Sequence, residues 1–251
     1  MTNAFDAGTY GRSFADVYDD WYSDRDPTPL VELVNELAAE ATRGRRASIL
    51  ELGAGTGRLA IPIAEAGHAV TALDSSTEML DRLAAKGPPP EMHALLGDAA
   101  NVDDFPDGPF DIVLAAFNLL SNLADRDAQQ RCLQAVADRL APGGSLVVEA
   151  FVAEPLLDRR RDLVTRSVTA DSVILIATDA DPATSSIRGA HIELRDGSVR
   201  LRPWRVCVAS PEEIDQMAAA VGLRLVARWA NASKSPFVAG EHTEHCSVYR
   251  R

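Results

Sequence analysis

Cysteine is scarce in this 251-residue sequence. Its three cysteines, Cys132, Cys207 and Cys246, lie far apart, and no Cys-x-x-Cys pair occurs. A disulfide framework or a zinc site needs closer, paired spacing, so both are excluded and reduced, buried thiols are expected. His242 and His245 precede an expected strand, where alternation places them on opposite faces. We therefore expect no bound metal.

Long apolar runs and excess basic charge are also lacking. No stretch approaches the roughly 20 apolar residues that span a bilayer. The polar, acidic start of the sequence lacks the basic and apolar regions of a signal peptide. We expect a cytoplasmic protein without a membrane partner. With 25 basic against 37 acidic residues, the net charge of −12 opposes nucleic-acid binding, which depends on neutralising phosphates.

What the sequence does contain is an alternation of short apolar strands and helices. Expected strands cover 48–53, 68–74, 92–98, 110–116 and 145–151, with helices at 28–41, 57–66, 76–86 and 126–140. This alternation predicts an α/β fold with a Rossmann-like, doubly wound and mostly parallel sheet. A helix at 210–222 and strands at 223–230 and 245–251 complete it.

Two further parts flank this expected core, which covers 48–152 and 209–251. Residues 153–208 contain β-rich runs without a convincing helix, with Asp196-Gly197 as a hairpin turn. They predict an inserted antiparallel β subdomain on the substrate side. Residues 1–47 predict an N-terminal helical lid.

The clearest motif is the glycine run that follows the first expected strand. It reads Glu51-Leu52-Gly53-Ala54-Gly55-Thr56-Gly57-Arg58 and opens a helix. Glycine lets the backbone turn sharply and approach a ligand closely. A dinucleotide site has the spacing G-x-G-x-x-G, whereas this run is G-x-G-x-G with arginine at position 58. The spacing therefore disfavours a pyrophosphate ligand.

This run resembles the first motif of the class I S-adenosylmethionine (SAM)-dependent methyltransferases. Three later elements match in order: Asp74 ends the second strand, Asp98-Ala99 follow the third, and Phe117-Asn118 follow the fourth. All lie at carboxyl ends of strands, where open α/β sheets bind ligands. As alternatives, Asp74 caps the next helix and Asp98 caps a turn.

The resemblance implies SAM as cofactor and S-adenosylhomocysteine as product. It assigns Asp74 to the ribose and Asp98-Ala99 to the adenine. Tyr18, Trp21 and Tyr22 fit a lid over the cationic sulfonium, or alternatively pin a helix to the core. The expected cofactor residues are Tyr18, Trp21, Tyr22, Glu51, Gly53, Ala54, Gly55, Gly57, Arg58, Asp74, Ser75, Met79, Asp98, Ala99, Phe117 and Asn118.

A β-rich insert after the fifth strand is similar to the arrangement in amino-sugar N-methyltransferases. We therefore expect methyl transfer to a nitrogen or oxygen of a small molecule. The substrate-binding candidates are Asn122, Glu149, Phe151, His191, Trp204 and Arg205. No motif names a catalytic residue. A dinucleotide-dependent oxidoreductase, a cofactor-binding protein with another reaction and a non-catalytic scaffold stay open, as does the oligomeric state, a homodimer included.

Overall fold

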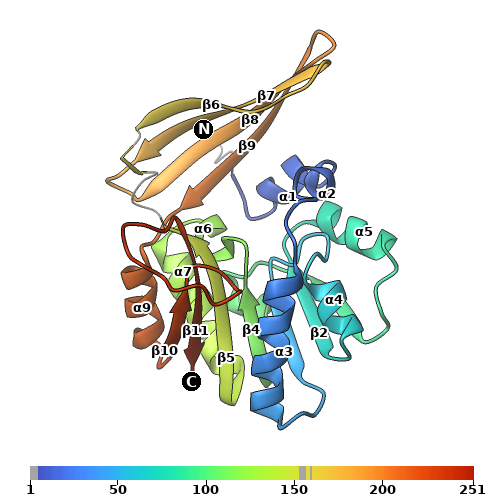
Figure 1. Cartoon of the computed structure of the whole chain (residues 1–251), viewed down its shortest axis with the longest axis vertical. Helices are drawn as coiled ribbons and strands as arrows, with labels where there is room; N and C mark the ends of the chain where they lie inside the picture. Colours follow the sequence, from blue (N-terminus) through green and yellow to red (C-terminus); the bar gives the residue numbers. More distant parts are fainter. Residues whose placement is uncertain (1–4, 153–156, 159) are drawn as a thin grey trace.

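The computed structural model describes residues 5–152, 157–158 and 160–251. Its main sheet has seven strands in the order β10-β11-β5-β4-β1-β2-β3 (Figure 1). Five neighbours from β5 to β3 run parallel, and β11 pairs antiparallel with both β5 and β10. The strands are β1 Ser48–Leu52, β2 Ala69–Asp74, β3 Met92–Leu96, β4 Phe110–Ala115, β5 Leu140–Phe151, β10 Arg224–Trp229 and β11 Glu244–Arg250. The predicted Rossmann-like fold is confirmed.

Helices cover both faces of this sheet and bury its central strands. Side chains of α3, α4 and α5 share one hydrophobic cluster with the sheet, and side chains of α7 and α9 share the other. These helices are α3 Thr28–Thr42, α4 Ala60–Glu65, α5 Thr77–Ala85, α7 Arg126–Arg139 and α9 Pro211–Ala220, with the short α6 Leu119–Asn122 and 3-10 helix η1 Val102–Asp104. No described helix combines the length and apolar character needed to cross a membrane.

Sequence patterns explain these helices. Leu30, Leu33, Val34 and Leu37 of α3 recur at helical spacing and are buried in the core. In α9, the Ser210 side chain accepts from the Glu213 N–H, and the Glu213 carboxylate accepts from the Ser210 N–H. Because α3 packs into the core, the part of the expected N-terminal lid that lies over the carboxyl edge of the sheet is residues 9–25, with the shorter helices α1 (Thr9–Phe14) and α2 (Tyr18–Trp21); this segment is called the lid below.

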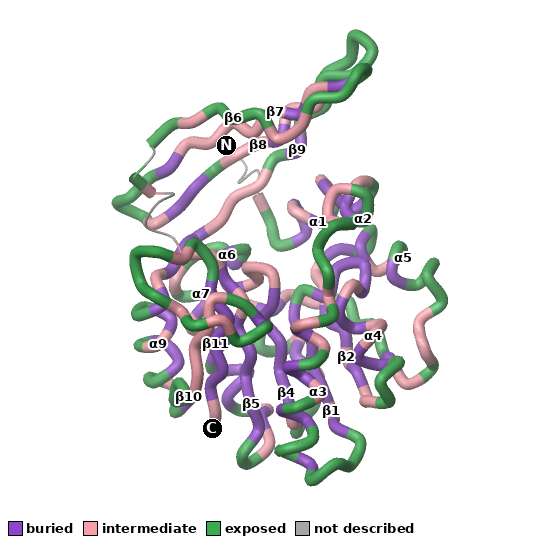
Figure 2. The backbone as a smooth tube through the Cα atoms, in the orientation of Figure 1, coloured by how far each residue is buried: buried purple, intermediate pink, exposed green. Residues whose placement is uncertain are grey.

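The insert forms a separate four-stranded antiparallel sheet above that same edge (Figure 1). Its strands are β6 Arg161–Val168, β7 Ser172–Asp181, β8 Ser186–Arg195 and β9 Ser198–Cys207, in sequence order. The sequence did not single out β6, because this edge strand is largely exposed and has weak apolar alternation. Figure 2 shows the contrast: the central core strands β1, β4 and β11 are mostly buried, whereas most of the insert is intermediate or exposed.

The fifth core strand also begins earlier than expected. Leu140 already pairs with Phe110, and regular pairing resumes where Ser145 meets Ile112, so the register shifts between them. The intervening Pro-Gly-Gly turn, with Gly143 at φ +80°, is a bulge inside the strand rather than a loop before it.

Candidate functional site

The glycine-rich turn between β1 and α4 adopts backbone angles that favour glycine. Gly53, Gly55 and Gly57 have φ values of +66°, +57° and +85°. A Cβ added at Gly53 would lie 2.6 Å from Leu119 Cδ1, whereas one added at Gly55 would be in ordinary contact with Met79 Sδ at 4.0 Å. Each glycine therefore avoids backbone strain, and Gly53 also leaves room for Leu119.

Asp74 at the end of β2 holds this turn in place. Its Oδ2 accepts from the Gly55 N–H at 2.8 Å, and its Oδ1 accepts from the Ser76 N–H at 2.9 Å. Burial raises the pKa of Asp74, while the surrounding backbone N–H groups lower it. The same side chain lines two cavities. Supporting the backbone and facing a ligand are therefore not alternatives for Asp74, because its geometry permits both.

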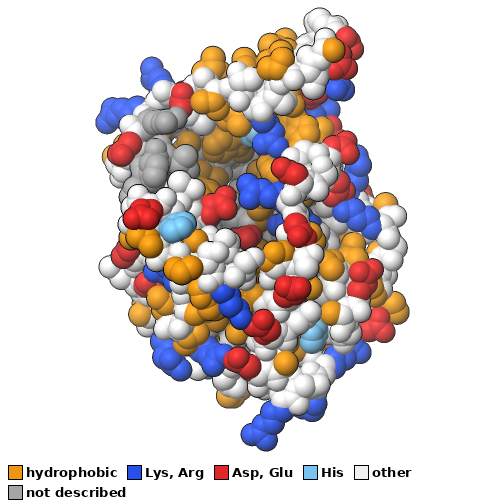
Figure 3. All heavy atoms as spheres, viewed as in Figure 1, with side chains coloured by type: hydrophobic (Ala, Val, Ile, Leu, Met, Phe, Trp, Pro, Cys, Tyr) orange, Lys and Arg blue, Asp and Glu red, His pale blue; other side chains and the backbone are white. Residues whose placement is uncertain are grey.

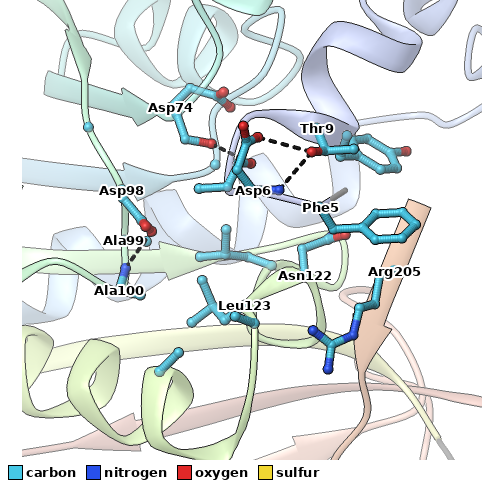
Figure 4. Close-up of a pocket in the computed structure, with 18 of the residues that line it drawn as sticks. Phe5, Asp6, Thr9, Asp74, Asp98, Ala99, Ala100, Asn122, Leu123 and Arg205 are labelled. Atoms are coloured by element: carbon cyan, nitrogen blue, oxygen red, sulfur yellow. Dashed lines mark hydrogen bonds between the residues drawn. The ribbon is translucent and has the colours of Figure 1, made fainter. Parts of the chain in front are cut away.

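The inner cavity has a volume of ≈ 200 Å³ and lies over the carboxyl ends of β2 and β3. Figure 4 shows Asp74 and Asp98 on one side of it and Phe5 and Arg205 on the other. Asp98 Oδ1 accepts from the Ala100 N–H at 2.8 Å, which orients the carboxylate beside Ala99. The cavity thus presents carboxylate acceptors in a row along the sheet edge.

A central cavity of ≈ 260 Å³ adjoins the inner one, and both are lined by Gly53, Asp74 and Leu119. One wall is the turn after β4, where Phe117 and Asn118 have positive φ values of +48° and +66°. Strained non-glycine backbone of this kind persists only when its surroundings hold it.

Glu149 and Asn118 provide that support for the turn after β4. Glu149 Oε2 accepts from the Phe117 N–H at 3.1 Å, and Asn118 Oδ1 accepts from the Phe151 N–H at 2.6 Å. The Glu149 side chain is thereby used within the protein, and Glu149 is not among the described residues that line the inner or the central cavity. We find it supporting the turn rather than facing a ligand.

The lid covers the central cavity with aromatic rings. Tyr10 stacks on Phe14 at 4.6 Å between ring centroids, and Tyr18 and Tyr22 each meet the Phe117 ring edge-on. Burial raises the pKa of Tyr10 and of Tyr18 well above the ordinary value, so both phenols stay neutral. Electron-rich ring faces without a negative charge suit a cationic ligand.

The insert contributes the opposite wall through His191 and Trp204. Both line the central cavity, and His191 Nδ1 and Trp204 Nε1 are buried without a hydrogen-bond partner among the described residues. Burial, with Arg166 and Arg202 nearby, lowers the pKa of His191 to about 4. The Trp204 ring lies over Gly189, where an added Cβ would be 2.3 Å from Cζ2. This wall therefore carries two buried polar atoms whose hydrogen bonding is unsatisfied among the described residues.

Lid and insert are joined by an ion pair between the buried Arg202 and the more exposed Asp16. Arg202 on β9, 1% exposed, donates through Nη1 to Asp16 Oδ1 at 2.6 Å and through Nη2 to Asp16 Oδ2 at 3.1 Å. It also donates to the Ser13 carbonyl and to Glu193. Removing Asp16 would leave a buried guanidinium with fewer partners, so this contact helps to hold the two walls of the central cavity together.

Glu51 lies beneath the glycine turn and carries an unused acceptor. Its Oε2 is buried and has no hydrogen-bond partner among the described residues. Burial raises the pKa of Glu51 to about 8, opposed by Arg58 and reinforced by Asp74. An unsatisfied buried carboxyl oxygen is unfavourable by itself and fits a site completed by a donor-bearing or cationic ligand.

The structure brings most of the expected residues to the inner and central cavities. Those that line them are Tyr18, Tyr22, Gly53, Gly55, Asp74, Ser75, Met79, Asp98, Ala99, Phe117, Asn118, Asn122, Phe151, His191, Trp204 and Arg205. Those that do not are Trp21, Glu51, Ala54, Gly57, Arg58 and Glu149. Trp21 instead packs among Phe14, His191 and Arg202, between lid and insert.

Sequence reasoning missed several lining residues, Tyr10 and Leu119 above all. Tyr10 had a usable signal, because Tyr10, Phe14, Tyr18 and Tyr22 recur every fourth position. Leu119 had none.

The described residues also contain no group of three potential metal ligands, and His245 Nδ1 lies 2.9 Å from Ser247 Oγ, its partner.

This geometry combines a Rossmann-like sheet, a G-x-G-x-G turn, carboxylates at successive strand ends and an aromatic lid. A model described as "Methyltransferase domain" matches residues 49–144. The CcbJ methyltransferase from Streptomyces caelestis is 35% identical, with 98% of this chain and 99% of that chain covered and a TM-score of 0.89. The chain belongs to the class I SAM-dependent methyltransferases.

Two further proteins are similar, one as a relative by sequence and one as a structure that shares the fold. The cypemycin N-terminal methyltransferase from a Streptomyces species is 28% identical over 198 residues, 76% of this chain and 78% of that protein. CalS10, a SAM-bound amino pentose methyltransferase from Micromonospora echinaspora, shares the fold at 18% identity, with a TM-score of 0.70 and 94% and 96% coverage. The protein is a SAM-dependent methyltransferase of the small-molecule type, and the comparisons give no support to an oxidoreductase.

Proposed function

We propose that this enzyme transfers the methyl group of SAM to a nitrogen atom of a small molecule. The observation that carries the proposal is the central cavity, which runs from the glycine turn to His191 and Trp204. It joins a site fitted to a cofactor with an aromatic chamber that has unused polar atoms. Names of relatives, which include an N-terminal and an amino pentose methyltransferase, support nitrogen as the acceptor atom.

The residues present fit SAM. In this proposal Asp74 accepts from the ribose hydroxyls, Asp98 and the Ala99 N–H meet the adenine, and the glycine turn approaches the methionine part. Tyr18, Tyr22 and Phe117 face the positive sulfonium. S-adenosylhomocysteine, the product, keeps the adenosine contacts and loses only the contact with the charge.

Bound SAM supplies a methyl group on a sulfonium, a donor that needs no activation by the protein. The chain aligns the acceptor and excludes water. His191 is neutral at pH 7, because burial lowers its pKa to about 4, and it can accept a hydrogen bond from an acceptor N–H through Nδ1. A hydroxyl acceptor would need a base with a pKa near 7. His191 is too weak a base for that task, which favours a neutral amine.

The proposal divides the chain into the three expected parts. Residues 48–152 and 209–251 hold the cofactor, residues 153–208 select the acceptor, and the region 1–47 supplies the lid through α1 and α2. The net charge of the whole chain, −12, fits an acceptor that is not nucleic acid. Its three free, buried thiols fit the reducing cytoplasm.

Two measurements test the proposal separately. Calorimetry with SAM and S-adenosylhomocysteine should show binding of both; no heat from either would contradict the cofactor. Incubation with methyl-labelled SAM and a panel of small amines and alcohols, followed by mass spectrometry and NMR, should place the label on nitrogen. Label found on oxygen would overturn the acceptor atom and leave the cofactor assignment intact.

A further inference from the structure

A third cavity lies outside the central one, between α2 and the insert sheet. This outer cavity has a volume of ≈ 540 Å³ and is lined from the lid by Trp21, Tyr22 and Arg25 and from the insert by Arg166, Glu193 and Arg195, among others. Figure 3 shows this face of the molecule hollowed below the insert, with acidic and basic side chains around the hollow. The cavity is therefore open and has charged walls.

Arg166 is the unusual residue of the outer cavity. Its guanidinium lies over the rings of Trp21 and Tyr22, 4.9 and 5.2 Å from their centroids, and one Nη2 hydrogen bond goes to the Trp21 carbonyl. It is half-buried, and no carboxylate of the described residues lies within ion-pair distance of it. A guanidinium that is held in one orientation and has N–H groups without a carboxylate partner can donate two parallel hydrogen bonds to an oxyanion.

Charges around the cavity reinforce this positive centre. Arg25 and Arg195 also line it, and their ion pairs are exposed and long, at 3.7 and 4.0 Å. Of the two lining carboxylates, Glu193 is already engaged by Arg202, and Asp24 remains as the competing negative charge. Three guanidinium groups against two carboxylates leave the lining of this cavity with a net positive charge.

The outer and central cavities meet at the lid. Tyr22 lines both, and Arg25 lies 5.9 Å over the ring of Phe117, which lines the central cavity. Tyr22 therefore stands between the two cavities, and a molecule with its nucleophile beside Phe117 would pass this ring to reach Arg166.

We infer that the outer cavity is a second acceptor subsite, in which Arg166 binds an oxyanion, a carboxylate or a phosphate, at the far end of the methyl acceptor. This inference rests on the proposed function, because it places the nucleophile of the same acceptor in the central cavity. It makes the acceptor a two-ended molecule, neutral where it is methylated and anionic where it is recognised.

Anion binding tests the subsite without knowledge of the acceptor. Inorganic phosphate and acetate are titrated separately at constant ionic strength, with calorimetry and tryptophan fluorescence as readouts. Of the three tryptophans, Trp21 lies beneath Arg166 and reports on the site. We expect saturable binding of one of them, and Arg166→Gln should weaken it roughly tenfold or more. Arg166→Lys, which keeps the charge and loses the fork, should weaken it less. The preferred probe identifies phosphate or carboxylate as the natural group.

The matched control is Arg161→Gln, which removes the same charge from the same strand at an exposed position outside the cavity. It should leave anion binding unchanged. SAM affinity and melting temperature are measured in every variant, so that a disturbed lid is recognised and a failure of the proposed function is seen separately. Equal binding in Arg166→Gln, or no saturable binding in the wild type, would show that Arg166 only supports the lid and would overturn the subsite.

Discussion

The two sheets of this enzyme differ in how they use their faces. Core strands β1 and β4 are buried on both faces, with Ile49, Leu50 and Val113 fully inaccessible. The insert sheet faces the lid on one side only. On its two edge strands, β6 and β9, apolar side chains remain exposed: Leu163 at 61%, Val199 at 65% and Leu201 at 62%. The core therefore builds its site at strand ends and turns, whereas the insert builds its part from side chains standing on one face.

This difference predicts separable effects. Core substitutions should change cofactor binding through backbone geometry and carboxylates, and insert substitutions should change acceptor binding with cofactor affinity intact. A substitution that affects both would show that the lid transmits the change, because Asp16 and Arg202 join it to the insert.

The largest effect is expected at Asp74. In Asp74→Asn, one oxygen that accepts hydrogen bonds becomes a donor, so SAM should bind about 10–150-fold more weakly. The melting temperature should fall as well, because Gly55 and Ser76 both donate to this carboxylate. Calorimetry and thermal unfolding measure the two effects. Asp179→Asn, at an exposed ion pair of the insert, is the control and should leave SAM affinity unchanged.

A smaller effect is expected in the insert. Trp204→Phe keeps a ring over Gly189 and removes the unpartnered Nε1 donor. The KM for the methyl acceptor should rise about tenfold, or kcat fall by a similar factor, while the Kd of SAM stays constant. Steady-state kinetics and calorimetry check this separation. A matching loss of SAM affinity would contradict the division between core and insert.

The third prediction concerns pH and the buried Glu51. Its folded-state pKa of about 8 exceeds its ordinary value of 4.5, so the folded state binds more protons and stability falls as pH rises through this window. Without cofactor, Glu51→Gln should therefore match the wild type near pH 4.5 and melt several degrees higher at pH 8. Thermal unfolding across pH measures the gap. If the difference in melting temperature between Glu51→Gln and the wild type instead became smaller toward pH 8, Glu51 would be ionised and paired.

The smallest effect is expected at the insert hairpin. Gly197 has φ +74° and no atom within 4 Å of an added Cβ, so Gly197→Ala should cost only about 1 kcal/mol, or about 2–4 °C in melting temperature. SAM affinity should not change. Gly53→Ala, with similar φ but Leu119 in the way, should weaken SAM binding at least severalfold. Equal SAM affinity in these two variants would remove the special role of the glycine turn.

Local sequence patterns were sufficient for the core. The glycine run, Asp74 and Asp98 each follow a short apolar strand, and parallel strands bring their carboxyl ends to one edge, so chain order alone places these residues together. The acidic ribose and adenine candidates therefore line adjoining cavities as the pattern indicates. The alternation of strands and helices likewise predicts the sheet, because the hydrophobic period of each strand and helix is set by neighbouring residues in the sequence.

Only the tertiary structure decided which aromatic and polar residues face those cavities. Trp21 and Tyr22 are neighbours in sequence, yet Tyr22 lines the central cavity and Trp21 packs against His191 and Arg202. Glu149, expected to face a substrate, instead holds the Phe117 N–H. Asp16 and Arg202 are 186 positions apart, and no local period relates them. The sequence determined where the strands end; packing between lid and insert, which depends on these distant contacts, determined which side chains meet there.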